Sequence, residues 1–445
     1  MAVTVEKLDK PSAEQNGNGK TWAKIDLVNP PDLGRSVQIV GEVVPVDPNE
    51  GPHPKNSRGE LGKALFNYYR NSISKDPLSR VGANTHSADK RNVLSENLNK
   101  APKGEINPDR VEVTDPEAMS RHLKRVAYYL GADAIGIAQA HPTMMYGGRR
   151  YSEDGTTTVE SSEGEGPEEL CRRYPYLIVA TQAWDYDKLQ AHRHFIGDAA
   201  YHVSQMRSNM IMKALEAYIR ELGYTALRAT ANPQAAALAA GMGELGRNGM
   251  VISEKFGARV HMPNAIQTDL PMAPGKPIDI GVADFCSVCR KCAITCPTNS
   301  IPFGDKVEFN GALKYKINWL TCYKLRPYTH DNWGSCLTCV AVCPFTKPNT
   351  WWRTLAIKTL TTPPVALRPY VVRALKAIDD RFWGVMKQKR VRWMGYDTGI
   401  KPGEHACTVA GCTADHDEAA SKVQGDVGFY APLKENTNRF VRRDV

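Results

Sequence analysis

The sequence lacks any apolar run of eighteen or more residues, so we expect no helix that spans a membrane. Residues 1–20 contain neither an apolar stretch nor a twin arginine, which predicts a cytoplasmic protein without a Sec or Tat signal and with a disordered start. A large charge imbalance is also missing, since 57 basic residues accompany 48 acidic ones. We therefore expect no nucleic acid partner. The basic stretches 387–392 and 439–443 are interpreted as solvated surface, or as a docking site for an acidic electron donor of the ferredoxin or flavodoxin type.

Cysteine, by contrast, is plentiful and patterned, because eight of the eleven cysteines fall into two runs. The last cysteine of each run is followed by a proline, Pro297 or Pro344. Three closely spaced thiolates hold one [4Fe–4S] cube, and the cysteine before the proline ligates the other cube. The sequence therefore predicts two [4Fe–4S] clusters. The first is assigned to Cys286, Cys289, Cys292 and Cys343, and the second to Cys322, Cys336, Cys339 and Cys296.

Two other uses of cysteine fit this pattern poorly. A zinc site is built from cysteine pairs rather than from four cysteines in one run with a second run behind it. A disulfide framework is typical of short secreted chains, whereas this chain has 445 residues. Three cysteines lie outside the runs. Cys407 and Cys412 could bind a metal together with His416, but structural thiols are the simpler interpretation for these two and for Cys171.

Composition and periodicity divide the chain into four parts. Residues 1–113 form an N-terminal extension with a strand-like piece at 37–46, and residues 114–275 form an α/β body. In the body we expect a helix that begins at Pro116 after the cap Asp115, buried strands at 134–138 and 176–181, and a long helix over 198–222. Residues 276–350 hold the two-cluster ferredoxin domain. Residues 351–445 form a C-terminal segment that packs on the core, with a helix over 369–383.

Several motifs follow one another between Tyr218 and Lys347. They are the stretch 218–226, the glycine-rich segment 240–249, the stretches 268–271 and 276–282, the two cysteine runs, and Cys343–Lys347. This order closely resembles the cobalamin-dependent reductive dehalogenases, to which the epoxyqueuosine reductases are related. The resemblance implies an α+β fold, with a nitroreductase-like cobalamin-binding core joined to a bacterial-type two-[4Fe–4S] ferredoxin domain.

The resemblance also implies a buried cobalamin in the base-off form, without a histidine below the cobalt. The sequence agrees, because it lacks the motif Asp-x-His-x-x-Gly that supplies such a ligand in other corrinoid proteins. Glycines allow a backbone to approach a bulky ligand and to offer it N–H groups. A tight loop shaped by packing alone is the alternative interpretation of the glycine-rich segment. The candidate cobalamin contacts are Gly241, Gly243, Gly246, Arg247 and Gly249.

In that family a tyrosine above the cobalt supplies the proton, assisted by a nearby basic residue, because a tyrosine with a pKa of ~10 needs a cation to ionise. Tyr201 is our candidate, although an ungapped count points to Gln205, one helical turn later. The basic residue is His261, with Arg259 as the alternative if the register of that segment shifts by two residues. Aromatic side chains that could line an apolar substrate cavity are Trp184, Tyr186, Trp351 and Trp352.

The leading hypothesis is an oxidoreductase that cleaves a carbon–halogen bond in a small organohalide. An external donor would reduce the clusters, the clusters would reduce cobalamin to Co(I), and Tyr201 would deliver the proton. An epoxyqueuosine reductase-like enzyme that acts on transfer RNA is the nearest alternative. A non-catalytic electron carrier is the other, and it predicts a protein without bound corrinoid.

Overall fold

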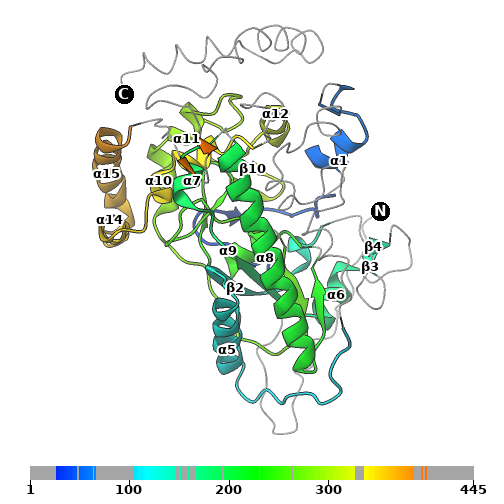
Figure 1. Ribbon diagram of the computed structural model, residues 1–445. Coiled ribbons are helices and arrows are strands. Elements are labelled where there is room, and N and C mark those ends of the chain that lie inside the picture. Colours follow the sequence, from blue (N-terminus) through cyan, green and yellow to red (C-terminus); the bar gives the residue numbers. More distant parts are fainter. Residues whose placement is uncertain are drawn as a thin grey trace, which may run out of the picture.

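The computed structural model describes most of the chain between residues 27 and 384 (Figure 1). The described residues are 27–47, 50–63, 65–66, 104–146, 150–151, 158–159, 166–192, 195–229, 231–262, 264–325, 335–384, 392–393 and 396–397. Cys407, Cys412, His416, residues 387–391 of the first basic stretch and the whole basic stretch 439–443 lie outside them. No helix in the described part combines the length and the apolar character that crossing a membrane requires.

A four-stranded antiparallel sheet forms the centre of the body. Its strands lie in the order β2 (Ala134–Gln139), β5 (Tyr176–Thr181), β9 (Ile266–Thr268) and β6 (Ala226–Arg228). β5 pairs with β2 along its whole length, in a register that sets Ile137 opposite Ile178. The strands predicted at 134–138 and 176–181 are thereby confirmed.

The sheet is covered on both faces, which explains why every residue of β5 is buried. Successive side chains of a strand point to opposite faces. Leu177 and Val179 belong to an apolar cluster with residues of helix α9 (Pro233–Ala239). Ile178 and Ala180 belong to a second cluster, formed with helices α5 (Pro116–Tyr129) and α8 (Phe195–Glu221). The continuous apolar run of β5 is thus the pattern of a strand inside a three-layer arrangement.

The two helices on one face begin and end largely where the sequence predicts. Asp115 caps α5, since its carboxylate accepts hydrogen bonds from the N–H groups of Glu117 (2.9 Å) and Ala118 (3.1 Å). Gly223 follows α8 with a φ of +84°, a conformation that favours glycine after a helix. The long helix starts at Phe195 rather than at residue 198. In Figure 1 this helix runs past the sheet toward the cysteine-rich part of the chain.

The cysteine runs lie on short helices and turns beside the body. Helix α10 (Val282–Val288) carries Cys286, α11 (Lys291–Ile294) carries Cys292, α12 (Trp319–Lys324) carries Cys322, and α13 (Thr338–Ala341) carries Cys339. A small sheet joins this part to the N-terminal extension. In it, β1 (Gln38–Ile39) pairs with β11 (Ala312–Lys314), which pairs with β10 (Val307–Phe309). The strand expected over 37–46 is shorter than predicted, because beyond Ile39 the chain bonds to the carbonyl of Gly311 and to the side chain of Asn310 rather than along a strand.

The helices after the cysteine runs, α14 (Trp351–Thr361) and α15 (Arg368–Phe382), pack as a pair against α10 (Figure 1). The helix predicted over 369–383 is therefore confirmed. The remaining described elements are α1 (Pro52–Ser57), α6 (Pro167–Arg173), α7 (Tyr186–Leu189), the short 3₁₀ helices Pro142–Met144, Pro344–Thr346 and Val365–Leu367, and three two-stranded sheets. These sheets are β3 (Arg150–Tyr151) with β4 (Thr158–Val159), β7 (Glu244–Leu245) with β8 (Val251–Ile252), and β12 (Arg392–Trp393) with β13 (Tyr396–Asp397).

Four charged side chains tie three distant segments together. Arg35 of the N-terminal extension contacts Asp279 (3.0 Å) and Asp284 (2.8 Å). Arg368 of α15 contacts the same two carboxylates at 2.7 and 3.0 Å. Because both arginines share both aspartates, the extension and the C-terminal helices are fixed to the segment that leads into the first cysteine run.

Candidate functional site

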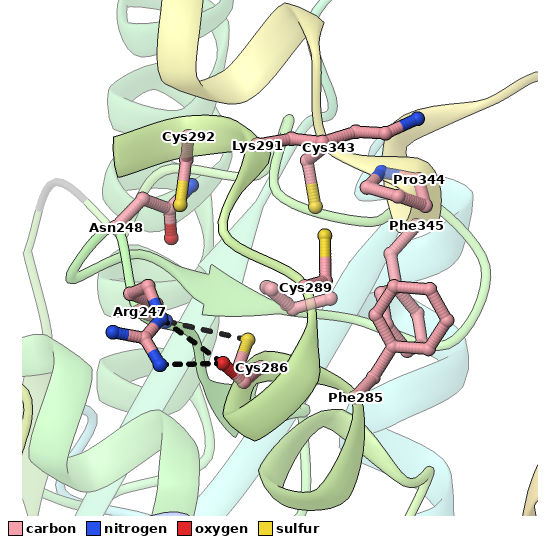
Figure 2. Close-up of a pocket in the computed structure, with 11 residues that line it drawn as sticks. Arg247, Asn248, Phe285, Cys286, Cys289, Lys291, Cys292, Cys343, Pro344 and Phe345 are labelled. Atoms are coloured by element: carbon pink, nitrogen blue, oxygen red, sulfur yellow. Dashed lines mark hydrogen bonds between the residues drawn. The ribbon is translucent and has the colours of Figure 1, made fainter. Parts of the chain in front are cut away.

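Four cysteines from both runs line a single cavity. Its space is about 320 Å³, including solvent at its open side. Figure 2 shows the four sulfur atoms pointing toward the space between them. The apolar wall includes Phe285 and Phe345, whose rings meet edge to face at 5.3 Å. These are the four cysteines that the sequence assigns to the first cluster, namely Cys286, Cys289, Cys292 and Cys343.

Burial determines the protonation state of these thiols. It raises the pKa of Cys286 and of Cys289 to about 12, so without iron both would stay protonated at neutral pH. Thiolates bind iron, and the metal compensates the buried negative charge when it displaces the protons. Within the described residues, no group of three or more histidine, cysteine or acidic side chains converges tightly enough for a single ion. A [4Fe–4S] cube differs from such a single-ion site, because each thiolate binds a different iron.

The cysteines assigned to the second cluster also lie near one another. Burial places the pKa of Cys339 well above its usual range, and the neighbouring Cys322, Cys336 and Cys296 raise it further. The N–H of Ser300 donates to the sulfur of Cys296 at 3.3 Å, as expected around cluster ligands. The grouping of the eight thiols into two cluster sites stays a prediction, and their placement agrees with it.

The glycine-rich segment is packed against protein. A Cβ atom on Gly241 would lie 2.2 Å from the carbonyl oxygen of Lys276, and one on Gly243 would lie 2.3 Å from that of Ile252. Gly246 and Gly249 would clash with Ile252 and Trp319 in the same way, at 2.6 and 2.8 Å. These contacts explain the glycines without a ligand, so their role as cobalamin contacts stays a prediction.

Two polar residues of this segment face the cysteine runs. The backbone N–H of Arg247 donates to the sulfur of Cys286 at 3.4 Å, and its guanidinium donates to backbone carbonyls nearby. Asn248 donates to the carbonyl of Cys339 at 3.3 Å. The segment therefore touches both cysteine runs. Its contact with cobalamin through Arg247 is a prediction for which the described contacts give no direct support.

Helix α8 carries the predicted proton donor, and the structure joins the two candidates. The side-chain N–H of Gln205 donates to the hydroxyl oxygen of Tyr201 at 2.8 Å. The same nitrogen lies 3.4 Å from Nδ1 of His261. The rings of Tyr201 and His261 meet edge to face at 5.3 Å. Tyr201, Gln205 and His261 thus form one hydrogen-bonded group, although they come from two distant segments.

Of the two basic candidates, His261 packs against the ring of Tyr201, whereas the described contacts of Arg259 are with other residues. The guanidinium of Arg259 donates to the carbonyl of Trp184 and lies 5.2 Å from the ring of Phe256. Burial lowers the pKa of Arg259. Residues 258–262 form no strand, so the register shift considered for this segment does not arise.

Trp184 also packs against this hydrogen-bonded group. Its ring meets that of Tyr201 edge to face at 5.1 Å, and its side chain is only 1% exposed. Within the described part of the chain, the indole N–H of Trp184 has no hydrogen-bond acceptor. The same is true there of the Nε–H of Arg259. Buried donors without a partner are unusual, and they fit a bound group that supplies acceptors.

The tryptophans at the start of α14 do not belong to this group. Trp351 and Trp352 stack on each other at 3.5 Å, and they are 64% and 63% exposed. These rings lie on the surface, and their expected part in a substrate cavity stays a prediction. Tyr186, in α7, is half-buried, and burial raises its pKa.

Two buried carboxylates link these elements, and sequence reasoning did not identify their role. Glu244 accepts hydrogen bonds from the N–H groups of Ile280 and Val282, both at 2.9 Å, and so caps α10 from a distance. Asp198 in α8 accepts one from Ser335, directly before Cys336, at 3.1 Å. Nothing local marks such residues, because their partners lie 36 or more positions away.

Comparisons with known proteins agree with this arrangement. Residues 285–347 match a 4Fe-4S dicluster domain. The tetrachloroethene reductive dehalogenase of Sulfurospirillum multivorans is 30% identical over 268 residues, which are 54% of this chain and 52% of that protein. An epoxyqueuosine reductase of Listeria monocytogenes is 30% identical over 110 residues, or 24% of this chain and 28% of that protein.

The solved structures point the same way. A catabolic reductive dehalogenase in complex with 3-bromo-4-hydroxybenzoic acid matches with a TM-score of 0.65 and 25% identity, over 84% of this chain and 52% of that one. The chain spans about half the length of the relatives it matches. The predicted resemblance to reductive dehalogenases, which are oxidoreductases, and more distantly to epoxyqueuosine reductases is confirmed.

Proposed function

We propose that this protein is a corrinoid- and iron–sulfur-dependent reductive dehalogenase with Tyr201 as the proton donor. The observation that carries the proposal is the position of the tyrosine group. Tyr201 packs on the apolar cluster that also contains Trp184 and three cluster cysteines, Cys286, Cys289 and Cys343. A proton donor is thus joined by continuous packing to an electron entry, in a chain similar to reductive dehalogenases along most of its length.

Two [4Fe–4S] clusters fit the eight cysteines, since four of these line one cavity and the others lie near one another. Base-off cobalamin fits the region around Tyr201, where buried donors of Trp184 and Arg259 have no acceptor among the described residues. When bound, cobalamin would supply the low-valent cobalt that cleaves a carbon–halogen bond. The sheet with helices on both faces supports a nitroreductase-like form of the core.

The side chains of this protein would bind the substrate and move the proton. The carbon–halogen bond breaks, the halide leaves with the bonding pair, and the carbon gains two electrons and the proton of the Tyr201 hydroxyl. Gln205 donates to the tyrosine oxygen and so stabilises the phenolate that remains. His261 then returns a proton from its place beside Gln205. Trp184 holds the phenol ring in place.

The substrate would be a small organohalide, and a separate ferredoxin or flavodoxin-type protein would deliver the electrons. The aromatic side chains around Tyr201 favour an apolar molecule. The similarity to an epoxyqueuosine reductase supports a second candidate, reduction of a modified transfer RNA. That candidate requires an RNA-binding surface, and binding driven by phosphates would weaken steeply with salt.

The test is anaerobic reconstitution with iron, sulfide and cobalamin, followed by a halide-release assay with reduced viologen on aryl and alkyl halides. We expect bound corrinoid and halide release from at least one compound. Absence of halide from every compound, with corrinoid bound, would contradict the dehalogenase proposal. A protein that binds no corrinoid would instead be an electron carrier.

A further inference from the structure

Arg247 is a fully buried cation held in a fixed position beside the first cysteine group. Its side chain is 1% exposed. Its Nε and one terminal nitrogen donate to the carbonyl of Cys286, at 3.0 and 2.8 Å (Figure 2). The other terminal nitrogen donates to the carbonyls of Pro302 (2.8 Å) and Gly304 (2.6 Å). The guanidinium also lies over the ring of Tyr315, 4.1 Å from its centre.

All of these partners are neutral. In the described part of the chain no carboxylate forms an ion pair with Arg247, whereas Arg35 and Arg368 each contact two. A guanidinium is always charged, and a buried charge without a counter-ion is costly. The thiolate of Cys286 becomes negative when it binds iron, and its sulfur accepts the backbone N–H of Arg247 itself.

We propose that Arg247 is the built-in counter-ion of the first [4Fe–4S] cluster and sets its reduction potential. An oxidised cube with four thiolates carries a net charge of about −2, and one electron makes it more negative. A fixed cation beside one ligand stabilises the reduced form more than the oxidised form, because attraction grows with the negative charge. Arg247 therefore raises the potential of this cluster.

The effect is specific to one cluster. The contacts of Arg247 are with Cys286 and with carbonyls of the same domain, and no hydrogen bond joins it to a cysteine of the second group in the described residues. A raised potential at the first cluster makes it the acceptor in transfer between the two. The apolar cluster on which Tyr201 packs contains three cysteines of the first group, whereas from the second group Cys339 packs against it. Because the first group has the larger share of this packing, the cation would direct electrons toward the proposed active site.

The inference rests on the first cluster of the proposed function, but on neither cobalamin nor the substrate. The experiment is a redox titration of the reconstituted holoprotein, with each cluster followed by electron paramagnetic resonance, for the wild type, Arg247→Gln and Arg247→Lys. Arg247→Gln keeps a hydrogen-bonding amide and removes the charge. We expect its first cluster to show a tenfold lower ratio of reduced to oxidised form at a given potential, about 59 mV for one electron.

Arg247→Lys keeps the positive charge but lacks the planar guanidinium. The reduction potential of its first cluster should therefore stay close to the wild-type value, even if the stability of the protein falls. The matched control is Arg220→Gln. Arg220 is also buried and donates to carbonyls, those of Ala226 (2.9 Å) and Gly104 (3.3 Å), but it lies on α8 away from the cysteines. This variant should lose stability without a change in either potential.

Equal shifts in Arg247→Lys and Arg247→Gln would overturn the proposal, because the hydrogen bonds and not the charge would then be responsible. An unchanged potential in Arg247→Gln with weakened cobalamin binding would overturn it as well, and would assign Arg247 to cobalamin instead. If Arg247→Gln fails to assemble its clusters, Arg247→Lys decides, since a tenfold fall in that variant contradicts a charge effect. These outcomes do not depend on halide release, because the redox titration measures the clusters without cobalamin chemistry or substrate.

Discussion

The cysteine groups and the tyrosine group of this protein are built in different ways. Cys286, Cys289 and Cys292 lie within seven residues of one another, so short turns bring their sulfurs to one cavity. Tyr201 and His261 are 60 positions apart and meet only because α8 packs beside the segment after β8. The first kind of site is encoded by spacing, whereas the second depends on the whole fold. Substitutions in the cysteine groups and in the tyrosine group should therefore have different effects on the protein.

The largest effect is expected from Cys289→Ser. Removing one of four ligands should empty the first cavity, so iron should fall to about half of the wild-type content and turnover should be lost. Cys171→Ser is the control, because Cys171 is buried in an apolar cluster with no other cysteine. Iron analysis and halide release measure both variants. A full iron content in Cys289→Ser would show that the grouping of the thiols is wrong.

The next largest effect is expected from substitutions in the tyrosine group. Tyr201→Phe removes the proton donor and should lower turnover by ~10²–10⁴-fold with both clusters intact. Gln205→Leu removes one hydrogen bond to the developing phenolate and should cost about tenfold. Steady-state rates with reduced viologen measure both. The placement of the proton donor fails if Gln205→Leu abolishes turnover while Tyr201→Phe leaves it unchanged.

A smaller effect tests whether the cysteine groups also depend on distant segments. Arg368→Met breaks the shared contacts with Asp279 and Asp284 and should cost about 1–3 kcal/mol of stability. Thermal unfolding of the holoprotein measures the loss. Arg373→Met, on the same helix, is the control, because no carboxylate in the described residues forms an ion pair with Arg373.

The pH dependence of that loss has a defined sign. Burial acts to raise the pKa of Asp279, but hydrogen bonds from Arg368, Gly281 and Arg35 outweigh it and hold the pKa below its usual value. A depressed carboxyl pKa stabilises the fold above the unfolded pKa of about 3.9, and this stability is lost as pH falls through the folded value. The cost of Arg368→Met should therefore be constant between pH 7 and 5. A cost that shrinks within that range would contradict the role of Asp279.

The smallest effect concerns Cys171, a thiol that is more buried than the cluster ligands and whose apolar cluster contains no other described cysteine. Burial raises its pKa to about 12, so it should react with iodoacetamide far more slowly than a free thiol at pH 8. Mass spectrometry of the alkylated native protein measures this. Rapid labelling of Cys171 would show that burial alone does not keep a thiol of this protein unreactive.

The difference between the two sites also explains what could be predicted from sequence. Features that depend on neighbouring residues could be predicted. These are the strands β2 and β5, the helix cap at Asp115 and the cysteine pattern. Local patterns could not show that Gln205 joins Tyr201 to His261, nor that Trp351 and Trp352 face outward. The hydrogen bonds of the Arg247 and Glu244 side chains could not be predicted either, because their partners follow them by 36 to 57 positions.

The most direct test of the central claim is the ratio of electrons to halide. Reduced viologen consumed and halide released are measured together in the reconstituted protein, with Tyr201→Phe in parallel. Two electrons per halide ion are expected for the wild type, with halide release sharply reduced in Tyr201→Phe. Viologen oxidation without matching halide would contradict reductive dehalogenation, and it would leave the cysteine groups as an electron carrier without its proposed reaction.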